Sequence, residues 1–305
     1  MTKVFIDGSV GTTGLRIFER LEGRKDIELL KISEELRKDT SARKEMLNNC
    51  DIAFLCLPDA AAIEAVSLID NKNAAVIDTS TAHRVKDGWA YGFPELSGRR
   101  ELIKNSKRIA NPGCHASGFI ALIEPLVKCG VIKSDAKLCC TSLTGYSGGG
   151  KKMIAEYEED GRDVLLDSPR MYGLNQSHKH LPEMRKICAL ENMPVFMPIV
   201  SDFYSGMQVT VPLFKEDIGC GIDKIKEIYK DYYKDGIVSF AEIEDAFMAS
   251  NHLSGRDDMT VSVVGNDDRI VLVSRFDNLG KGASGAAIQN MNILLGVDEK
   301  TGLNV

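Results

Sequence analysis

The stretch that decides the fold reads VFIDGSVGTTGLRIFERL and covers residues 4–21. It begins with a short, mostly apolar strand, continues directly into a loop with three glycines, and ends in a helix-forming run that starts at Leu15. Strand, glycine loop and helix in this order are typical of dinucleotide-binding folds, in which the helix N-terminus faces the phosphates. We therefore expect a nucleotide phosphate to bind at this loop.

The three glycines have separate expected tasks. Gly8 permits a tight turn, Gly11 lets the backbone approach a pyrophosphate, and Gly14 allows close packing of helix and strand. The spacing is GxxGxxG and not GxGxxG, and a plain turn is the alternative, but the position after the first strand favours a phosphate site. The residues expected to bind the cofactor here are Gly8, Ser9, Val10, Gly11, Thr12, Thr13 and Gly14.

The end of the second predicted strand, residues 27–32, bears on the choice between NAD and NADP. If Ser33 takes the strand-end position, with Arg37 and Lys38 nearby, the hydroxyl and the cations favour the 2′-phosphate of NADP. If Glu34 takes that position, its carboxylate favours the ribose of NAD. The sequence favours NADP, with Ser33 as the contact residue, and leaves NAD open.

Further strands at 51–58 and 74–78, with a helix at 60–69 between them, continue the alternation of strand and helix. This alternation predicts an α/β fold with a doubly wound parallel sheet whose ligands bind at the carboxyl ends of the strands. Arg84 follows one such end and is a candidate for binding a phosphate or carboxylate of the substrate. A surface salt bridge is the alternative for this arginine.

Residues 109–118 read IANPGCHASG and place Cys114 in the first turn of a predicted helix. Free amide N–H groups and the helix dipole stabilise a thiolate there more than a thiol. Most cysteines of an intracellular chain are small buried hydrophobes, and we interpret the other seven cysteines in that way. The Pro-Gly turn and the small neighbours make Cys114 the candidate nucleophile.

The segment SHKHLPEM at 177–184 contains two of the five histidines, just before a predicted helix start. A metal site would need further ligands at recognisable spacing, which are missing, so no metal is expected. We expect His178 or His180 to act as the acid/base partner of Cys114, and the sequence does not decide between them.

Two glycine-rich segments complete the candidate site. GYSGGGKK at 145–152 favours an anion-binding loop, with Ser147 and Lys151 as substrate contacts and a mobile hinge as the alternative. DNLGKGASGAAIQNMN at 277–292 opens a long helix whose small residues, Gly282 among them, would admit a flat cofactor ring or another backbone. From residue 195 onward the β-prone segments predict a largely antiparallel sheet for substrate contacts and oligomerisation.

Composition restricts the partners. The chain has 305 residues and a net charge of −6 with scattered basic residues, which argues against binding of nucleic acid. Its apolar runs are far shorter than the roughly 20 residues that cross a membrane. Eight cysteines without a disulfide or zinc pattern, and no secretion signal, favour the cytoplasm. The expected partner is a small-molecule substrate.

In this order the motifs GSVGTTG, NPGCHASG, GYSGGGKK, SHKHLPEM and DNLGKGASGAAIQNMN resemble those of the N-acetyl-gamma-glutamyl-phosphate reductases of arginine biosynthesis, in their shorter form. The resemblance implies a Rossmann domain, here 1–113 with 280–305, that binds NADPH. It also implies an α+β catalytic and oligomerisation domain of the glyceraldehyde-3-phosphate dehydrogenase type, here 114–279. A homo-oligomer, either a dimer or a tetramer, is expected.

The implied reaction is the NADPH-dependent reduction of N-acetyl-gamma-glutamyl phosphate to N-acetyl-glutamate 5-semialdehyde, with release of phosphate, through a thioester on Cys114. Two alternatives stay open. The chain could be another semialdehyde dehydrogenase, acting on aspartyl phosphate or an aminoadipate derivative, because such enzymes share the nucleophile and the nucleotide loop. It could also be an NADP-binding sensor in which Cys114 is inert.

Overall fold

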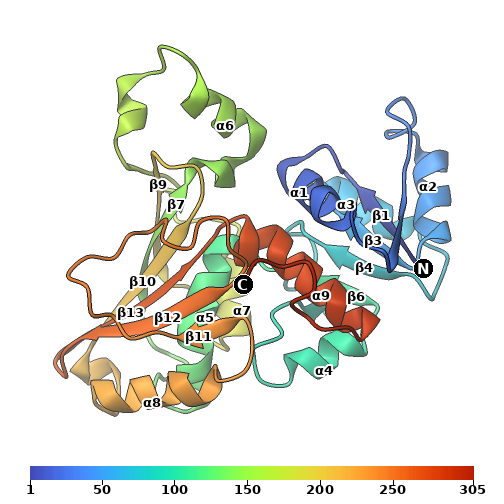
Figure 1. The fold of residues 1–305 in the computed structure, drawn as a ribbon. Helices are drawn as coiled ribbons and strands as arrows, with labels where there is room; N and C mark the ends of the chain where they lie inside the picture. The colour runs from blue at the N-terminus through green and yellow to red at the C-terminus, as the bar shows by residue number, and fades with distance from the viewer. The chain divides into compact units, whose positions relative to one another are not determined.

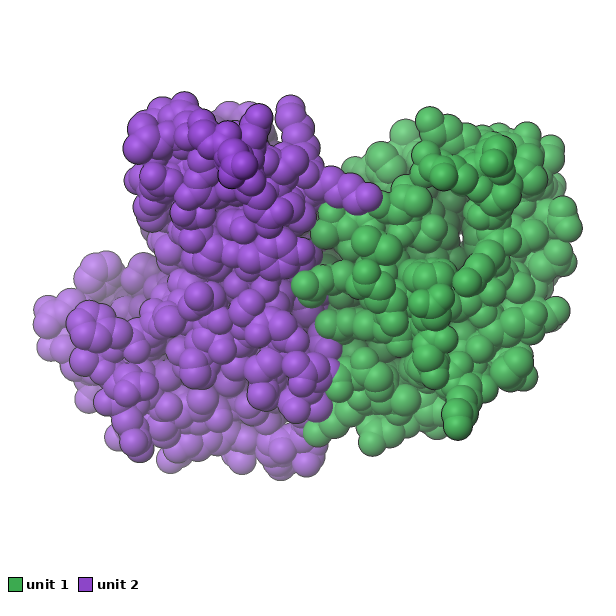
Figure 2. Space-filling view, turned by 45° about the horizontal axis from the view of Figure 1, so that its top comes forward, with its two compact units in different colours: residues 1–112, 283–303 green, residues 113–282, 304–305 purple.

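The computed structural model describes all residues from 1 to 305, and the chain folds into two compact units (Figure 1, Figure 2). The first unit comprises residues 1–112 and 283–303, and the second comprises residues 113–282 and 304–305. The chain therefore passes between the units just before Gly113 and just after Gly282. None of its helices is both long enough and apolar enough to cross a lipid bilayer.

The first unit is built on a parallel sheet. Its strands are β1 (Thr2–Asp7), β2 (Ile27–Leu30), β3 (Ile52–Leu55), β4 (Ala75–Asp78), β5 (Ala90–Tyr91) and β6 (Arg108–Ala110). Their order is β2-β1-β3-β4-β6-β5, and every neighbouring pair is parallel. All residues of β3 and β4 are buried, because both faces of the sheet are covered.

Helices cover the two faces of this sheet (Figure 1). They are α1 (Thr12–Leu21), α2 (Thr40–Asn49), α3 (Asp59–Ser67), α4 (Arg99–Lys104) and α9 (Gly285–Leu295). Ile6 of β1 packs in one buried cluster with residues of α1 and α9, whereas Phe5 packs in another with residues of α2 and α3. Consecutive residues of a strand point to opposite faces, so the sheet is doubly wound, as the sequence predicted.

The second unit is built on a mixed sheet. Its strands are β7 (Cys139–Gly145), β8 (Arg170–Met171), β9 (Val195–Ser201), β10 (Met207–Phe214), β11 (Val238–Phe240), β12 (Met259–Gly265) and β13 (Arg269–Phe276). Their order is β11-β12-β13-β10-β7-β9-β8. The pairs β11 with β12 and β7 with β9 are parallel, and the other pairs are antiparallel. This is the largely antiparallel sheet that the sequence predicted.

Helix α5 (Cys114–Lys128) lies against β10 and β13 of this sheet. A glycine makes the close approach possible, because a Cβ at Gly118 would lie 2.4 Å from Cγ2 of Val209 and 2.8 Å from Oγ of Ser274. Ser274 donates a hydrogen bond to the carbonyl of Gly118 at 3.1 Å. The unit also contains α6 (Gly150–Glu158), α7 (Leu181–Ile187) and α8 (Ile222–Tyr232). The packing of α5 on the sheet determines where its first residue, Cys114, is held.

Candidate active site

The glycine loop between β1 and α1 owes its shape to side chains that are missing. Gly8 has a φ of +90°, and a Cβ on it would lie 2.4 Å from the carbonyl oxygen of Cys56. A Cβ on Gly14 would lie 2.3 Å from the carbonyl oxygen of Gly8. No side chain caps the N-terminus of α1, where Gly11 is the N-cap residue. The backbone N–H groups of its first turn are thus left for an anionic ligand.

A pocket of about 470 Å³ adjoins this loop. The loop contributes Gly8, Ser9 and Val10 to its wall, and the segment after β2 contributes Arg37 and Lys38. The remaining lining residues are Ile6, Asp7, Ile32, Arg43, Leu57 and Ala61. A pocket of this size, with apolar walls, a glycine loop and cations at its rim, is suited to one half of a dinucleotide.

The cations of this pocket differ in their availability. Arg43 is buried and donates to Asp7 at 2.9 Å and to Glu64 at 3.3 Å, so its charge is balanced within the protein. Burial raises the pKa of Asp7, and the Arg43 guanidinium opposes that rise. Arg37 forms only a 3.5 Å pair with Glu34, whose side chain is 80% exposed. A phosphate would therefore compete more easily for Arg37 than for Arg43.

The structure places the residues after β2 differently from the prediction. The strand ends at Leu30, not at residue 32, and residues 34–38 form turns outside the sheet. Ser33 is hydrogen-bonded to the carboxylate of Glu35, and the residues of this segment that line the pocket are Ile32, Arg37 and Lys38. Ser33 therefore does not take the strand-end position that the sequence argument assumed.

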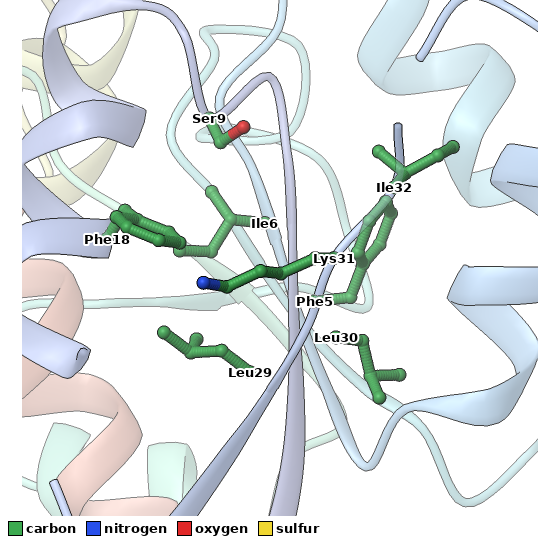
Figure 3. A pocket seen from close by; sticks show the side chains of 8 residues that line it. All are labelled: Phe5, Ile6, Ser9, Phe18, Leu29, Leu30, Lys31 and Ile32. Carbon is green, nitrogen blue, oxygen red and sulfur yellow. The ribbon is translucent and has the colours of Figure 1, made fainter. Parts of the chain in front are cut away.

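A smaller pocket of about 160 Å³ lies beside β2 (Figure 3). The side chain of Lys31 extends across it, with its ammonium 5.2 Å from the ring centre of Phe18 and 3.7 Å from the carboxylate of Glu22. Lys31 lines this smaller pocket and not the larger one beside the glycine loop, so we do not assign it to a cofactor phosphate. The other lining residues are Phe5, Ile6, Ser9, Leu29, Leu30 and Ile32.

Cys114 is the first residue of α5, as the sequence predicted. Gly113 is the N-cap residue, and its extended backbone ends the Asn-Pro-Gly turn. The side chain of Cys114 is partly exposed, whereas Cys50 is buried. Burial raises the pKa of the Cys50 and Cys56 thiols to about 12. Cys114 thus differs from Cys50 in its access to solvent, and from both cysteines in its position at a helix N-terminus.

The buried carboxylate of Glu183 lies between the turn that precedes Cys114 and the imidazole of His180. Glu183 accepts a hydrogen bond from the backbone N–H of Gly113 at 3.2 Å. Its other carboxylate oxygen lies 3.9 Å from Nε2 of His180. Glu183 and His180 are one helical turn apart at the start of α7, so the carboxylate faces the imidazole and the turn together. Glu183 belongs to the candidate site, although the sequence analysis did not include it.

His178 has a different environment. Its Nδ1 accepts a hydrogen bond from the backbone N–H of His180 at 3.2 Å, and its ring centre lies 4.7 Å from that of His180. The ring also meets those of His115 and Phe196 edge-on, at 5.6 and 5.1 Å. No group of three or more His, Cys, Asp or Glu side chains is arranged to hold a metal ion.

Arg84 is anchored to the backbone of the first unit. Its Nε donates to the carbonyl of Asn111 and its Nη2 to the carbonyl of Thr79, both at 3.0 Å. These carbonyls follow β6 and β4, so the guanidinium lies at the carboxyl ends of two parallel strands. Both of these partners are backbone carbonyls, and they hold the guanidinium within the first unit.

The predicted anion-binding loop is partly buried. Ser147 accepts a hydrogen bond from Nδ2 of Asn278 at 3.0 Å and is only 1% exposed, which favours a role in holding the loop. Lys151 is exposed in the first turn of α6. Gly282 lies in the second unit, where a Cβ on it would be 3.0 Å from Cβ of Cys114. The small size of Gly282 therefore makes room for the nucleophile.

Comparison with known proteins agrees with this geometry. Residues 3–106 match the semialdehyde dehydrogenase NAD-binding domain, and residues 114–278 match the semialdehyde dehydrogenase dimerisation domain. An N-acetyl-gamma-glutamyl-phosphate reductase of a Nostoc species is 43% identical, with 99% of each chain covered. The reductase of a Chelativorans species is 46% identical, covering 96% of this chain and 98% of that one. The chain belongs to the N-acetyl-gamma-glutamyl-phosphate reductase family.

Solved structures share the fold. Aspartate semialdehyde dehydrogenase II of Vibrio cholerae, complexed with ASA, has a TM-score of 0.74 at 17% identity and covers 97% of this chain and 98% of its own. Aspartate semialdehyde dehydrogenase of Candida albicans, with NADP, has a TM-score of 0.68 at 15% identity, covering 97% and 99%. Membership of the N-acetyl-gamma-glutamyl-phosphate reductase family and this fold agree with a nicotinamide cofactor in the first unit.

The sequence analysis did not single out two further residues near the candidate site, His115 and Tyr172. His115 follows the nucleophile directly, yet it is fully buried, and its Nε2 lies 2.6 Å from the hydroxyl of Tyr172. The spacing of Glu183, three residues after His180 at a helix start, was a usable signal for the carboxylate. Tyr172 lies 57 residues from His115, and only the fold brings the two together.

Proposed function

We propose that the protein catalyses the NADPH-dependent reduction of N-acetyl-gamma-glutamyl phosphate to N-acetyl-glutamate 5-semialdehyde, with release of phosphate. One observation carries the proposal. The partly exposed Cys114 begins a helix, and a single buried carboxylate, that of Glu183, faces both its turn and the imidazole of His180. In a chain 43–46% identical to named reductases, this arrangement suits thiol catalysis on an acyl phosphate.

Residues 1–113 with 280–305 would hold the cofactor, and residues 114–279 would carry the chemistry and the contacts between subunits. A dinucleotide suits the glycine loop, because Gly8 and Gly14 allow its backbone to pack closely and no side chain caps the N-terminus of α1. When bound, NADPH supplies the hydride that reduces the acyl carbon. Arg37 and Lys38 support NADP over NAD, since they are the cations in the pocket wall that a 2′-phosphate can most easily engage. Ser33, which bonds to Glu35 and does not line this pocket, is left out of the proposed cofactor site.

Cys114 would act as the nucleophile. Its thiolate attacks the acyl carbon, a carbon–sulfur bond forms, and inorganic phosphate leaves with the electrons of the carbon–oxygen bond. The N-terminus of α5 stabilises the thiolate before attack and offers backbone N–H groups to the oxygen that becomes negative. The resulting thioester is the species that is reduced to the aldehyde, and Cys114 then departs as a thiolate again.

His180 would be the acid/base residue. It accepts the thiol proton, and Glu183, at 3.9 Å, then balances the positive charge of the imidazolium. The imidazolium gives a proton to the oxygen of the tetrahedral species after reduction and takes it back when the carbon–sulfur bond breaks. His178 is the less suitable base, since its Nδ1 already accepts the backbone N–H of His180, and we assign it to substrate contact.

The remaining predicted contacts would bind the substrate's anionic groups. Arg84, at the carboxyl ends of β4 and β6, is the main candidate for phosphate or carboxylate, and Lys151 is a second candidate. Ser147 would support the loop that carries Lys151, and Gly282 would leave space for the reacting groups beside Cys114. The match to a dimerisation domain supports a homo-oligomer, and eight free cysteines suit a reducing cytoplasm.

The proposal is tested by the reverse reaction. We expect native protein to reduce NADP in the presence of N-acetyl-glutamate semialdehyde only when inorganic phosphate is added, and we expect the Cys114→Ser variant to lose this activity. Faster turnover with aspartate semialdehyde than with N-acetyl-glutamate semialdehyde would contradict the assigned substrate and favour the aspartyl phosphate alternative. Persistent activity in Cys114→Ser would refute the covalent route. If iodoacetamide failed to modify Cys114 at neutral pH, the protein would instead be an NADP-binding sensor with an inert Cys114.

A further inference from the structure

Asn111 lies three residues before Cys114 and forms hydrogen bonds to several segments of the first unit. Its backbone N–H donates to the carbonyl of Asp78 at 2.8 Å, and its own carbonyl accepts from Nε of Arg84 at 3.0 Å. Its side chain, which is only 1% exposed, donates from Nδ2 to the carbonyl of Ala283 at 3.0 Å. Asn111 therefore joins the end of β4, the segment of Arg84 and the segment that leads into α9.

The orientation of the Asn111 amide follows from its partners. A carbonyl oxygen can only accept, so the amide atom that faces Ala283 is the nitrogen, and the other atom, Oδ1, is an acceptor. Oδ1 accepts from Nδ2 of Asn290 in α9 at 3.2 Å, and the same nitrogen donates to the carbonyl of Gly92 at 2.9 Å. Both amides are thereby fixed, because this series of hydrogen bonds ends on a main-chain carbonyl at each side.

The bond between Asn111 and Ala283 lies next to both places where the chain passes from one unit to the other. The chain passes into the second unit directly after Pro112 and returns to the first directly after Gly282. Within the second unit, a Cβ on Gly282 would lie 3.0 Å from Cβ of Cys114. The two connecting segments are thus joined by a hydrogen bond in the first unit and by close packing at the nucleophile in the second.

Little freedom remains in the turn between Asn111 and Cys114. The ring of Pro112 fixes its own φ near about −65°. The N–H of Gly113 donates to Glu183 at 3.2 Å. The start of α5 therefore depends on two anchors, which are the Asn111 amide before the proline and the Glu183 carboxylate after it. A misplacement of about 1 Å in a reacting group can lower a rate about 100-fold, so a change at either anchor should affect catalysis.

We propose that Asn111 is a positioning residue for the reduction, because its side-chain amide, oriented by Asn290, holds the turn that places the sulfur of Cys114 for reaction. Asn111 would act through the turn and not on the reacting atoms. The inference rests on the proposed function, since it requires Cys114 to be the nucleophile. Loss of the amide N–H should slow the reaction and leave the intrinsic reactivity of the thiol nearly unchanged.

The test replaces the amide by a carboxylate of the same shape. In Asn111→Asp one oxygen can still accept from Asn290, but the other faces the carbonyl of Ala283 and has no hydrogen to donate. We expect kcat for phosphate-dependent reduction of NADP to fall about 10- to 100-fold. The KM for N-acetyl-glutamate semialdehyde and the rate at which iodoacetamide alkylates Cys114 should stay within about twofold of the native values.

Asn292→Asp is the matched control. Asn292 is another fully buried amide of the first unit, and it donates to the carbonyls of Glu299 and Thr301 at 3.0 and 2.9 Å. The same substitution there removes donors to main-chain carbonyls that do not belong to the turn, so kcat should be native. A kcat of Asn111→Asp within about twofold of the native value, or an equal fall of kcat in Asn292→Asp, overturns the proposal.

A second set of variants decides the matter if melting curves show that Asn111→Asp does not fold. Asn290→Ala removes the donor to Oδ1 of Asn111 and leaves the bond to Ala283 in place, so kcat should fall in the same direction but less than in Asn111→Ala. Combining Asn111→Ala with Asn290→Ala should cause no further loss, because the two amides act through one bond. A native kcat in folded Asn290→Ala, or losses that multiply in the double variant, contradict the proposal.

The native protein separates this inference from the proposed function. If it does not reduce NADP with N-acetyl-glutamate semialdehyde and phosphate, the proposed function fails and the role of Asn111 fails with it. If the native protein turns over and Asn111→Asp does so at the same rate, only the role of Asn111 fails. An alkylation rate of Cys114 that falls by the same factor as kcat would show that Asn111 acts on thiol reactivity and not on position, which would also overturn the inference.

Discussion

The two units prepare their sites in opposite ways. In the first unit, Gly8 and Gly14 create the loop by lacking side chains, and the groups offered to a ligand are mainly backbone N–H groups. In the second unit, the surroundings of Cys114 are made of side chains, with Glu183 bonded to Gly113 and facing His180. Substitutions that add atoms to the glycine loop should therefore weaken cofactor binding in the first unit. Substitutions that remove polar side-chain atoms should lower the catalytic rate in the second unit.

The largest effect should come from removing the imidazole in the second unit. We expect His180→Ala to lower kcat about 100- to 10,000-fold, because general acid/base catalysis contributes about that much. NADPH affinity should be unchanged, since the first unit is untouched. Steady-state kinetics and a fluorescence titration measure the two quantities. His178→Ala serves as the comparison. A loss of kcat in His178→Ala that equals or exceeds the loss in His180→Ala would contradict the assignment of His180 as the acid/base residue.

Adding a Cβ atom to the glycine loop should weaken the binding of NADPH to the first unit. In Gly14→Ala the new Cβ would meet the carbonyl oxygen of Gly8 at 2.3 Å and Cα of Ser9 at 2.9 Å, so the loop must shift. We expect NADPH to bind about 10- to 100-fold more weakly, as an overpacking cost of about 1–3 kcal/mol implies. Gly23→Ala is the control, because nothing lies within 4 Å of its Cβ. If Gly14→Ala and Gly23→Ala bound NADPH equally well, the glycine loop would not be part of the NADPH site.

Cofactor preference should depend on Arg37. We expect Arg37→Ala to raise the KM for NADPH about tenfold and to leave the KM for NADH nearly unchanged, since one charge-assisted contact to the 2′-phosphate is lost. Lys31→Ala, which removes a cation that does not line the larger pocket, should behave like the native protein. Parallel kinetics with both cofactors decide the matter, and an equal change for NADPH and NADH would remove Arg37 from the 2′-phosphate site.

The smallest effect concerns the neutrality of His115. The pKa of this imidazole falls from 6.5 to about 3 on folding, so the unfolded chain binds a proton in this interval that the folded chain does not. Stability is therefore full above pH 6.5 and falls as the pH drops, by about 2 kcal/mol between pH 7 and pH 5 for this group. Urea unfolding of the native protein and His115→Phe should show a weaker pH dependence in the variant. Identical pH dependence would mean that His115 is not buried neutral.

The features that the sequence revealed are local ones. The glycine loop and the helix start at Cys114 each lie within a dozen residues, and backbone conformation alone produces them. The bond from Gly113 to Glu183 spans 70 residues, and the bond from His115 to Tyr172 spans 57. Such pairs depend on strand order and helix packing, which periodicity does not specify. The burial of Ser147, which bonds to Asn278, was missed for the same reason, whereas β2 ends early because a local turn follows it.

The central claim is that Cys114 forms a covalent bond with the acyl group. The most direct measurement mixes native protein with N-acetyl-gamma-glutamyl phosphate in the absence of NADPH and determines the mass of the protein within seconds. The account predicts an added N-acetylglutamyl group, located on the peptide that contains Cys114, which disappears when NADPH is supplied. Turnover without any such adduct, or an adduct on a different residue that NADPH removes, would contradict it.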